Sequence, residues 1–204
     1  MPVLTIIAGP NGAGKSTHSK DLVAHLEIDA FDFDKEFYSI WSQFQFDPAI
    51  EQGAFDRAHE FYLEKRAEAL QCQYNFAFET NYHTKEIIPV IDQFKKSGYK
   101  IELIFICLEN ESIAIERVKE RVAKGGHPVS ESIIRERFKN GLTLLDESFG
   151  LYDTVSIYLS EWKKIEPLIS IEAQSEIVTQ FNPIPDTIKM QLKHLHEFLS
   201  KDIA

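Results

Sequence analysis

The chain has 204 residues, 44% of them hydrophobic and 26% charged, and its formal net charge is −10. This composition is typical of a globular protein, and the length suits one α/β domain with a substantial core. The acidic charge disfavours nonspecific binding to nucleic acid. The first residues lack a signal-peptide pattern and the apolar runs are too short to cross a bilayer, so we expect a cytoplasmic protein without a membrane partner. Cys72 and Cys107 lack metal-ligand spacing, and we expect both to be buried free thiols.

The first predicted strand, 3–8, leads into a glycine-rich loop that matches the pattern G-x-x-x-x-G-K-[ST] and precedes a segment with helical spacing. The loop comprises Gly9, Pro10, Asn11, Gly12, Ala13, Gly14, Lys15, Ser16 and Thr17. Its glycines let successive backbone N–H groups point at phosphate oxygens, and the following helix adds the positive end of its dipole. Lys15 can reach the β- and γ-phosphates, and the Ser16 hydroxyl can bind Mg²⁺. A glycine turn that binds nothing is the alternative, but the intact pattern and its flanks favour a nucleoside triphosphate site.

Strands and helices are expected to alternate along the rest of the chain. The further predicted strands are 28–33, 74–79, 101–108 and 154–159. Helix-start and helix-stop signals lie between them at Asp47-Pro48, Thr84, Gly98, Asn110 and Ser130. This order predicts a parallel sheet with helices on both faces and a ligand site at the carboxyl ends of the strands. No linker is visible, so residues 1–204 are expected to form one domain. In its C-terminal extension, 161–204, a strand or hairpin is expected over 167–180 and an amphipathic helix over 186–200.

Acidic side chains follow two of the predicted strands. Asp32 and Asp34 end the second, and Glu79 with Thr80 ends the third. In an extended chain, Asp32 and Asp34 would face the same side. A phosphotransferase needs a carboxylate to accept the proton of the attacking hydroxyl and a second polar group to orient the acceptor. For Asp34, a helix N-cap is an equally good interpretation.

Residues 117–139 carry seven basic and three acidic side chains in an otherwise acidic protein. Arg117 and Arg121 are spaced to share one helix face, and Gly125-Gly126 supplies a flexible turn. In nucleotide kinases, a helical lid with arginines closes over the phosphates and excludes water. The segment therefore predicts a lid, whereas a solvated helix face is the alternative. His127 has no carboxylate near it in sequence and is expected to pack within the loop.

Four motifs in this order resemble the zeta-toxin-like P-loop kinases, a group also labelled as predicted ABC-type ATPases. They are the loop 9–17, Phe-Asp-Phe-Asp at 31–34, Phe-Ala-Phe-Glu-Thr at 76–80, and the basic segment through Ile-Ile-Arg-Glu-Arg-Phe at 133–138. The resemblance covers roughly residues 3–160. It implies that Lys15 and Ser16 handle the phosphates and Mg²⁺, and that Asp34 is the catalytic base. It also places the acceptor at Glu79 and Thr80, and Arg117 and Arg121 in the lid.

The chain departs from the family pattern at two places. Asp32-Phe33-Asp34-Lys35 stands where the family usually has Asn-Ala-Asp-Glu, which makes Asp32 a rival base. Asn81-Tyr82 follows Glu-Thr where a small or hydroxylated residue is common, so the acceptor stays open.

The predicted function is an ATP-dependent small-molecule kinase with ATP and Mg²⁺, whose acceptor hydroxyl could belong to a nucleotide sugar. The alternative is a nucleotide-hydrolysing regulator of a protein partner. The resemblance leaves room for an antitoxin-like partner, which the sequence itself does not support. An ABC-type ATPase is disfavoured because no Leu-Ser-Gly-Gly-Gln signature occurs.

Overall fold

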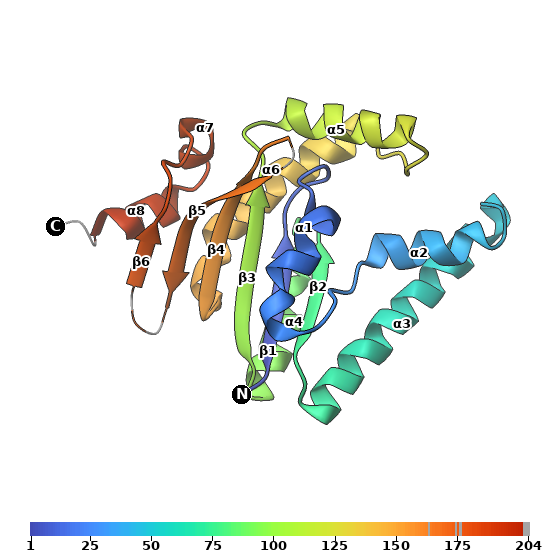
Figure 1. Cartoon of the computed structure of the whole chain (residues 1–204), viewed down its shortest axis with the longest axis horizontal. Coiled ribbons are helices and arrows are strands. Elements are labelled where there is room, and N and C mark those ends of the chain that lie inside the picture. The colour runs from blue at the N-terminus through green and yellow to red at the C-terminus, as the bar shows by residue number, and fades with distance from the viewer. Residues whose placement is uncertain (163, 174, 176, 202–204) are drawn as a thin grey trace.

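The computed structural model describes residues 1–162, 164–173, 175 and 177–201. Its six strands form one sheet in the order β2-β1-β3-β4-β5-β6, drawn in Figure 1. The strands are β1 (Val3–Ala8), β2 (Phe76–Thr80), β3 (Lys100–Cys107), β4 (Thr154–Ser160), β5 (Ile165–Glu172) and β6 (Ile177–Gln180). The first four are mutually parallel, and β5 and β6 continue the sheet in antiparallel pairing. The expected hairpin over 167–180 is therefore confirmed as an antiparallel extension of the sheet.

Helices cover both faces of the sheet and project beyond one of its edges. They are α1 (Lys15–Leu22), α2 (Phe33–Ser42), α3 (Glu51–Cys72), α4 (Ile87–Lys96), α5 (Glu111–Ala123), α6 (Glu131–Ser148), α7 (Asp186–Lys189) and α8 (Lys193–Lys201), with short 3₁₀ turns at Ala24–Leu26, Pro48–Ile50 and Phe149–Leu151. In Figure 1, α1 lies in front of the sheet, whereas α4 and α6 lie behind it. The hairpin of α2 and α3 extends past β2, and α5 runs across the top of the molecule. This arrangement confirms the predicted P-loop kinase-type α/β fold with a helical lid.

The predicted strand at 28–33 is wrong. Only Phe31 pairs with the sheet, through an isolated bridge to Phe78, and α2 begins at Phe33. Asp32 ends the extended segment because its side chain accepts a hydrogen bond from the Lys35 backbone N–H at 3.0 Å and so caps the helix. Asp34 consequently lies in the first turn of α2, not on a strand.

The other predicted elements hold with small shifts. The third strand covers 76–80 where 74–79 was expected, and α4 begins at Ile87, three residues after Thr84. Gly98 follows α4 with φ 82°, and Asn110 and Ser130 cap α5 and α6 as predicted. The single helix expected over 186–200 is instead the two helices α7 and α8. Cys107 is buried, but Cys72 is exposed at the end of α3, contrary to the expectation for it.

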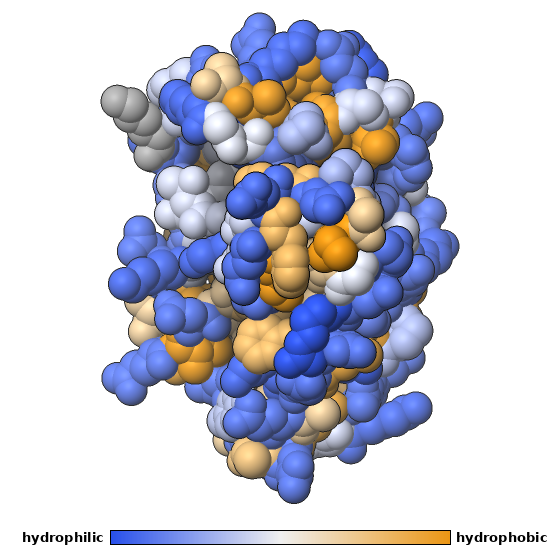
Figure 2. Space-filling model, turned by 90° about the vertical axis from the view of Figure 1, so that its right-hand side faces the viewer, coloured by the Kyte–Doolittle hydropathy of each residue, from blue (hydrophilic) through white to orange (hydrophobic). Residues whose placement is uncertain are grey.

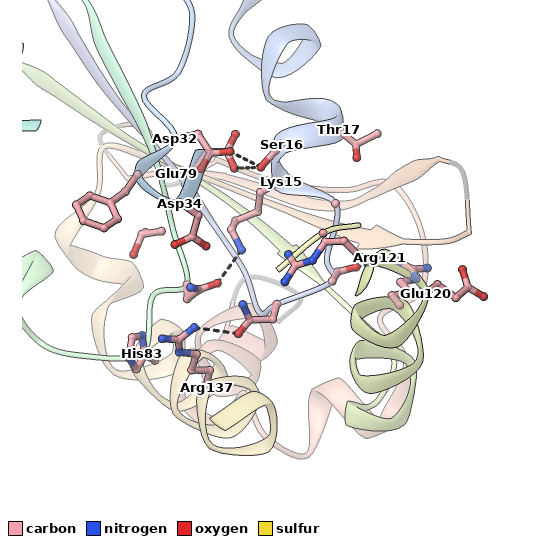
Figure 3. A pocket seen from close by; sticks show the side chains of 18 of the residues that line it. Lys15, Ser16, Thr17, Asp32, Asp34, Glu79, His83, Glu120, Arg121 and Arg137 are labelled. Carbon is pink, nitrogen blue, oxygen red and sulfur yellow. Dashed lines mark hydrogen bonds between the residues drawn. The ribbon is translucent and has the colours of Figure 1, made fainter. Parts of the chain in front are cut away.

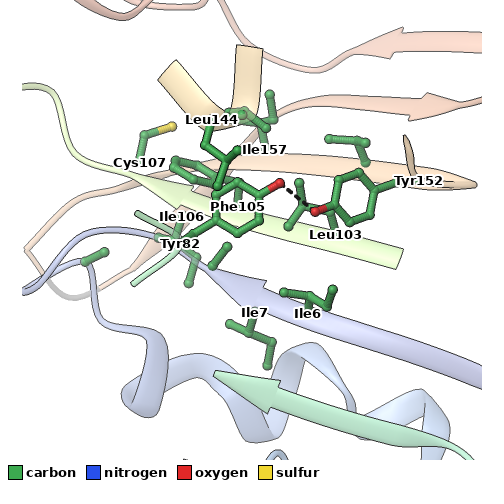
Figure 4. Close-up of a cluster of buried hydrophobic side chains, with 14 of the residues drawn as sticks. Ile6, Ile7, Tyr82, Leu103, Phe105, Ile106, Cys107, Leu144, Tyr152 and Ile157 are labelled. Atoms are coloured by element: carbon green, nitrogen blue, oxygen red, sulfur yellow. Dashed lines mark hydrogen bonds between the residues drawn. The ribbon is translucent and has the colours of Figure 1, made fainter. Parts of the chain in front are cut away.

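The core packs against both faces of the sheet, and Figure 4 shows a part of it around the central strands. Ile6, Leu103, Phe105 and similar side chains of the central strands have less than 2% of their surface exposed. Within it, the Tyr82 hydroxyl lies 2.5 Å from the Tyr152 hydroxyl and 2.7 Å from Ser148 Oγ. Since buried hydroxyls need partners, this group fixes the segment that follows β2.

The α2–α3 hairpin encloses a smaller cluster of its own, built on Phe37, Ala54 and Ala58. Phe44 and Phe46, between α2 and α3, are about half exposed, and Figure 2 shows apolar side chains scattered among hydrophilic ones on this side. Among the helices of the described residues, none combines the length and apolar character needed to cross a bilayer.

Candidate functional site

A cavity of about 750 Å³ opens at the carboxyl ends of β1 and β2. Four segments line it: the glycine-rich loop, the start of α2, the end of β2 and the facing sides of α5 and α6. Figure 3 shows charged and polar side chains from all four pointing into this space. The cavity lies where a parallel α/β sheet is expected to bind its ligand.

The glycine-rich loop has the backbone shape expected for a phosphate cradle. Gly9, Gly12 and Gly14 have φ values of 147°, 80° and 88°, which favour glycine. At Gly9, a Cβ would lie 2.3 Å from the Ile106 carbonyl oxygen, so a side chain cannot fit there. Gly14 is the N-cap residue of α1, so the N-terminal N–H groups of this helix point toward the loop.

Lys15 lies at the centre of the loop. Its Nζ donates to the carbonyl oxygens of Gly9 and Pro10 at 2.7 and 3.2 Å and to Asn81 Oδ1 at 3.0 Å. Burial lowers the pKa of Lys15 to about 8, although the carboxylates of Glu79 and Asp34 act in the opposite direction. With that pKa, most of the ammonium groups remain charged at pH 7 and can bind a phosphate.

Ser16, Asp32 and Glu79 bring three oxygen-bearing side chains together. Ser16 Oγ lies 2.6 Å from Asp32 Oδ2 and 2.7 Å from Glu79 Oε2. Burial raises the pKa of Glu79, and the nearby charge of Asp32 raises it further. Hard oxygen donors of this kind are the ligands that Mg²⁺ prefers, so the set fits a magnesium ion.

Asp34 differs from its neighbours in having no hydrogen-bond partner among the described residues. It is exposed in the first turn of α2 and lines the cavity, as Figure 3 shows. Asp32, by contrast, is occupied twice, by Ser16 and as the cap of α2. The structure thus gives the two carboxylates different surroundings: both line the cavity, but Asp32 is hydrogen-bonded within the described part of the protein and Asp34 is not.

The two predicted lid arginines have different contacts. Arg117 donates from Nη1 to Gly12 O and Ser160 Oγ, at 3.2 and 2.7 Å, and from Nη2 to Ser160 O at 3.2 Å. It therefore joins the middle of α5 to the glycine-rich loop and the end of β4. Arg121 lies one helical turn further along and donates to the His127 carbonyl oxygen at 3.0 Å. Both line the cavity, but Arg117 is hydrogen-bonded to the glycine-rich loop, whereas Arg121 is hydrogen-bonded to the turn between α5 and α6.

Sequence reasoning missed two groups in the cavity. Arg137 of α6 points into it and donates to Asn11 Oδ1 at 3.3 Å (Figure 3). Its place in the basic segment 117–139 was visible, but no spacing rule links it to the glycine-rich loop 126 residues away. His83 also lines the cavity, and its pKa is lowered by burial and then by Arg137. Of the remaining loop residues, Asn11 and Ala13 are buried and Thr17 is exposed, and both Asn11 and Thr17 line the cavity.

A second cavity, of about 350 Å³, adjoins the first. Phe33, Glu79 and Thr80 line both. Its walls are largely apolar and come from α3, α4 and the edge of the sheet, with Tyr62, Phe78 and others. A molecule larger than a phosphate group could therefore extend from Glu79 into this space.

The sequence pattern that defines the zeta toxin family matches residues 1–164, which is most of the chain. The chain belongs to the zeta toxin family. A curated Haemophilus influenzae protein, described as uncharacterized, is 29% identical to this family member over 70 residues, which are 34% of the chain and 50% of that protein. The match thus spans half the length of that relative.

Solved structures share the fold of this zeta toxin family member. One from the PezAT toxin–antitoxin system of Streptococcus pneumoniae aligns with a TM-score of 0.66 and 15% identity, over 98% of this chain and 88% of that chain. The complex AvrRxo1-ORF1:AvrRxo1-ORF2 aligns with a TM-score of 0.65 and 14% identity, over 97% of this chain and 63% of that chain. A further AvrRxo1 structure, with ATP, gives a TM-score of 0.58 at 13% identity, over 98% of this chain and 63% of that chain. Family and fold together support a nucleotide-binding, kinase-like function.

Proposed function

We propose that the protein is a kinase that transfers the γ-phosphoryl group of ATP to a hydroxyl group of a small molecule. The observation that carries this proposal is that Lys15 and Ser16 share one cavity with carboxylates that are hydrogen-bonded to Ser16 and with one carboxylate that has no such bond. Asp32 and Glu79 contact Ser16, whereas Asp34 is open. A protein that only bound a nucleotide would need the loop, but not a free carboxylate beside it.

The glycine-rich loop is proposed to bind the triphosphate. Backbone N–H groups of 9–17 and Lys15 Nζ would hold the β- and γ-phosphates, which Lys15 could reach by exchanging its carbonyl partners for phosphate oxygens. Ser16 and Asp32 would hold Mg²⁺, which when bound neutralises charge on the phosphates. Arg121 and Arg137 face the same cavity from two helices and would stabilise the charge that develops on the transferred group.

Asp34 is proposed to act as the general base. The acceptor hydroxyl gives its proton to the Asp34 carboxylate, its oxygen forms a bond to the γ-phosphorus, and the bond from that phosphorus to the β,γ-bridging oxygen breaks, which releases ADP. Glu79 and Thr80 would orient the acceptor, since they line both cavities. The second cavity gives room for the rest of a small molecule, for which a nucleotide sugar remains a candidate.

The PezAT and AvrRxo1 structures come from proteins that pair with a second chain, which supports the proposal of an antitoxin-like partner here. A regulator that hydrolyses nucleotide for such a partner is the competing proposal. It predicts ATP consumption that needs no acceptor and depends on the partner.

A screen of a metabolite library for ATP-dependent phosphorylation tests the kinase proposal. Phosphorylated products are identified by mass spectrometry, with Lys15→Ala and Asp34→Asn as matched controls. We expect a product with the unchanged protein and none with either variant. ATP hydrolysis that no metabolite alters, and that Asp34→Asn leaves intact, would contradict the kinase proposal.

A further inference from the structure

One contact joins two segments whose neighbouring residues line the large cavity. Tyr38 of α2 and His127 of the turn between α5 and α6 are 89 residues apart in sequence, yet Tyr38 Oη lies 3.0 Å from His127 Nε2. Their rings meet edge to face, with centroids 4.1 Å apart and planes at 86°. The lid thus touches the α2–α3 hairpin through a hydrogen bond and an aromatic contact, which we term the Tyr38–His127 clasp.

Each side of the clasp is attached to a group of the proposed active site. Tyr38 follows Asp34 by four residues, so both lie on the same face of α2. On the other side, Arg121 Nη2 donates to the carbonyl oxygen of His127 at 3.0 Å. At Gly126, a Cβ would lie 2.6 Å from Arg121 Cγ and 2.9 Å from Arg121 O, so this turn packs directly on the arginine. The clasp therefore connects the helix of Asp34 to the turn that holds Arg121.

The ionisation of the two rings agrees with a neutral hydrogen bond. Burial raises the pKa of Tyr38 to about 12, with the Asp34 charge adding to the effect. Burial and then the charge of Arg121 lower the pKa of His127, and the Asp34 charge opposes them. At neutral pH, both rings are therefore uncharged, and one hydrogen bond joins Tyr38 Oη and His127 Nε2, with the donor set by the imidazole tautomer.

We propose that Tyr38 and His127 are positioning residues, which hold Arg121 and Asp34 at a set separation across the nucleotide when the lid is closed. This inference rests on the proposed kinase function for the roles of Arg121 and Asp34. Neither ring need touch the reacting atoms. If His127 only filled space in the loop, removal of the Tyr38 hydroxyl would leave kcat unchanged. If it positions Arg121 through the hydrogen bond, that removal should lower kcat.

Four variants test the clasp: Tyr38→Phe, His127→Ala, His127→Gln and the double variant Tyr38→Phe/His127→Ala. Tyr38→Phe keeps the ring and removes the hydroxyl, whereas His127→Gln keeps a group near the position of Nε2 that can donate or accept a hydrogen bond. Tyr158→Phe is the control, since Tyr158 is half-buried in β4 and does not line the cavity. Thermal melts of every variant verify that it is folded.

We expect Tyr38→Phe and His127→Ala to lower kcat for ATP consumption by about 3- to 10-fold, the effect of one hydrogen bond, with the KM for ATP changed by less than about twofold. His127→Gln should recover most of the loss. Because the two residues act through one contact, the double variant should be no slower than His127→Ala. Wild-type kcat in Tyr38→Phe, or effects that multiply in the double variant, would overturn the proposal.

Hydrogen exchange over 121–128 tests the clasp independently of turnover. Tyr38→Phe should speed exchange in this segment by a similar factor, and Tyr158→Phe should leave it unchanged. If the unchanged protein consumes no ATP but Tyr38→Phe still speeds exchange, the kinase proposal fails and the contact stands. If exchange over 121–128 is the same in both variants, the clasp does not hold the lid, whatever the activity.

Discussion

Replacing aspartate by asparagine should have different effects at Asp34, whose carboxylate has no hydrogen-bond partner among the described residues, and at Asp32, whose carboxylate is hydrogen-bonded. Asp34→Asn keeps the size of the side chain but removes the oxygen that accepts a proton. We expect phosphoryl transfer to fall by about 10²- to 10⁴-fold, which corresponds to roughly 3–5 kcal/mol of transition-state stabilisation. Binding of Mg·ATP should hardly change, because the Asp34 carboxylate makes no hydrogen bond to the glycine-rich loop.

Asp32→Asn should behave differently, because Asp32 contacts Ser16 at 2.6 Å and caps α2 at 3.0 Å. Asparagine is as good an N-cap as aspartate, so the melting temperature should not move. Loss of the charge should instead raise the Mg²⁺ concentration needed for half-maximal activity, and saturating Mg²⁺ should restore most of the rate. Asp32→Ala removes the cap as well, at about 1 kcal/mol, which lowers the melting temperature by roughly 2–4 °C for a chain of this size.

The assay is ATP-dependent product formation with the acceptor found by the metabolite screen, measured over a Mg²⁺ titration. Binding of a fluorescent ATP analogue is followed in parallel. If Asp32→Asn abolishes transfer at saturating Mg²⁺ while Asp34→Asn is fully active, Asp32 is the base and the reasoning from its contacts is wrong. Equal losses in both variants, with no recovery by Mg²⁺, would refute the division of roles.

Four further predictions concern the loop, the lid and the acceptor. Lys15→Ala should weaken Mg·ATP binding by at least about tenfold without changing the circular-dichroism melt, and unchanged turnover would refute its assignment. In the unchanged protein, affinity for Mg·ATP should fall from pH 7 to pH 9, because Lys15 loses its charge near pH 8; titration calorimetry of Lys15→Ala should show no such fall. Arg121→Ala should lower kcat by about 10²-fold or more with little change in nucleotide affinity, so equal effects on both would contradict a transition-state role. Glu79→Gln should raise the KM for the acceptor, measured by initial rates, and an unchanged KM would remove Glu79 from that site.

Local patterns in the sequence were sufficient for the glycine-rich loop and most strands. The loop needs only its own glycines, Lys15 and Ser16 to form, and buried runs such as 3–8 carry enough apolar side chains to identify a strand. The helix caps Asn110 and Ser130 were likewise readable, because a cap depends on contacts only three residues away. The strand prediction for 28–33 was wrong because the short apolar run suggested a strand, whereas the local cap at Asp32 begins α2 there.

The meeting of distant side chains could not be read from the sequence. Arg137 reaches Asn11, Asn81 reaches Lys15 and Tyr38 reaches His127, and each pair is joined only by the packing of whole helices against the sheet. Such contacts depend on tertiary geometry, and no local sequence pattern at one residue identifies its distant partner. The sequence by itself determined that a triphosphate loop lies at the end of the first strand, with acidic residues and a basic lid in fixed order. Only the tertiary structure decided which carboxylate is occupied and which is open, because that depends on where α2 begins relative to the end of β2.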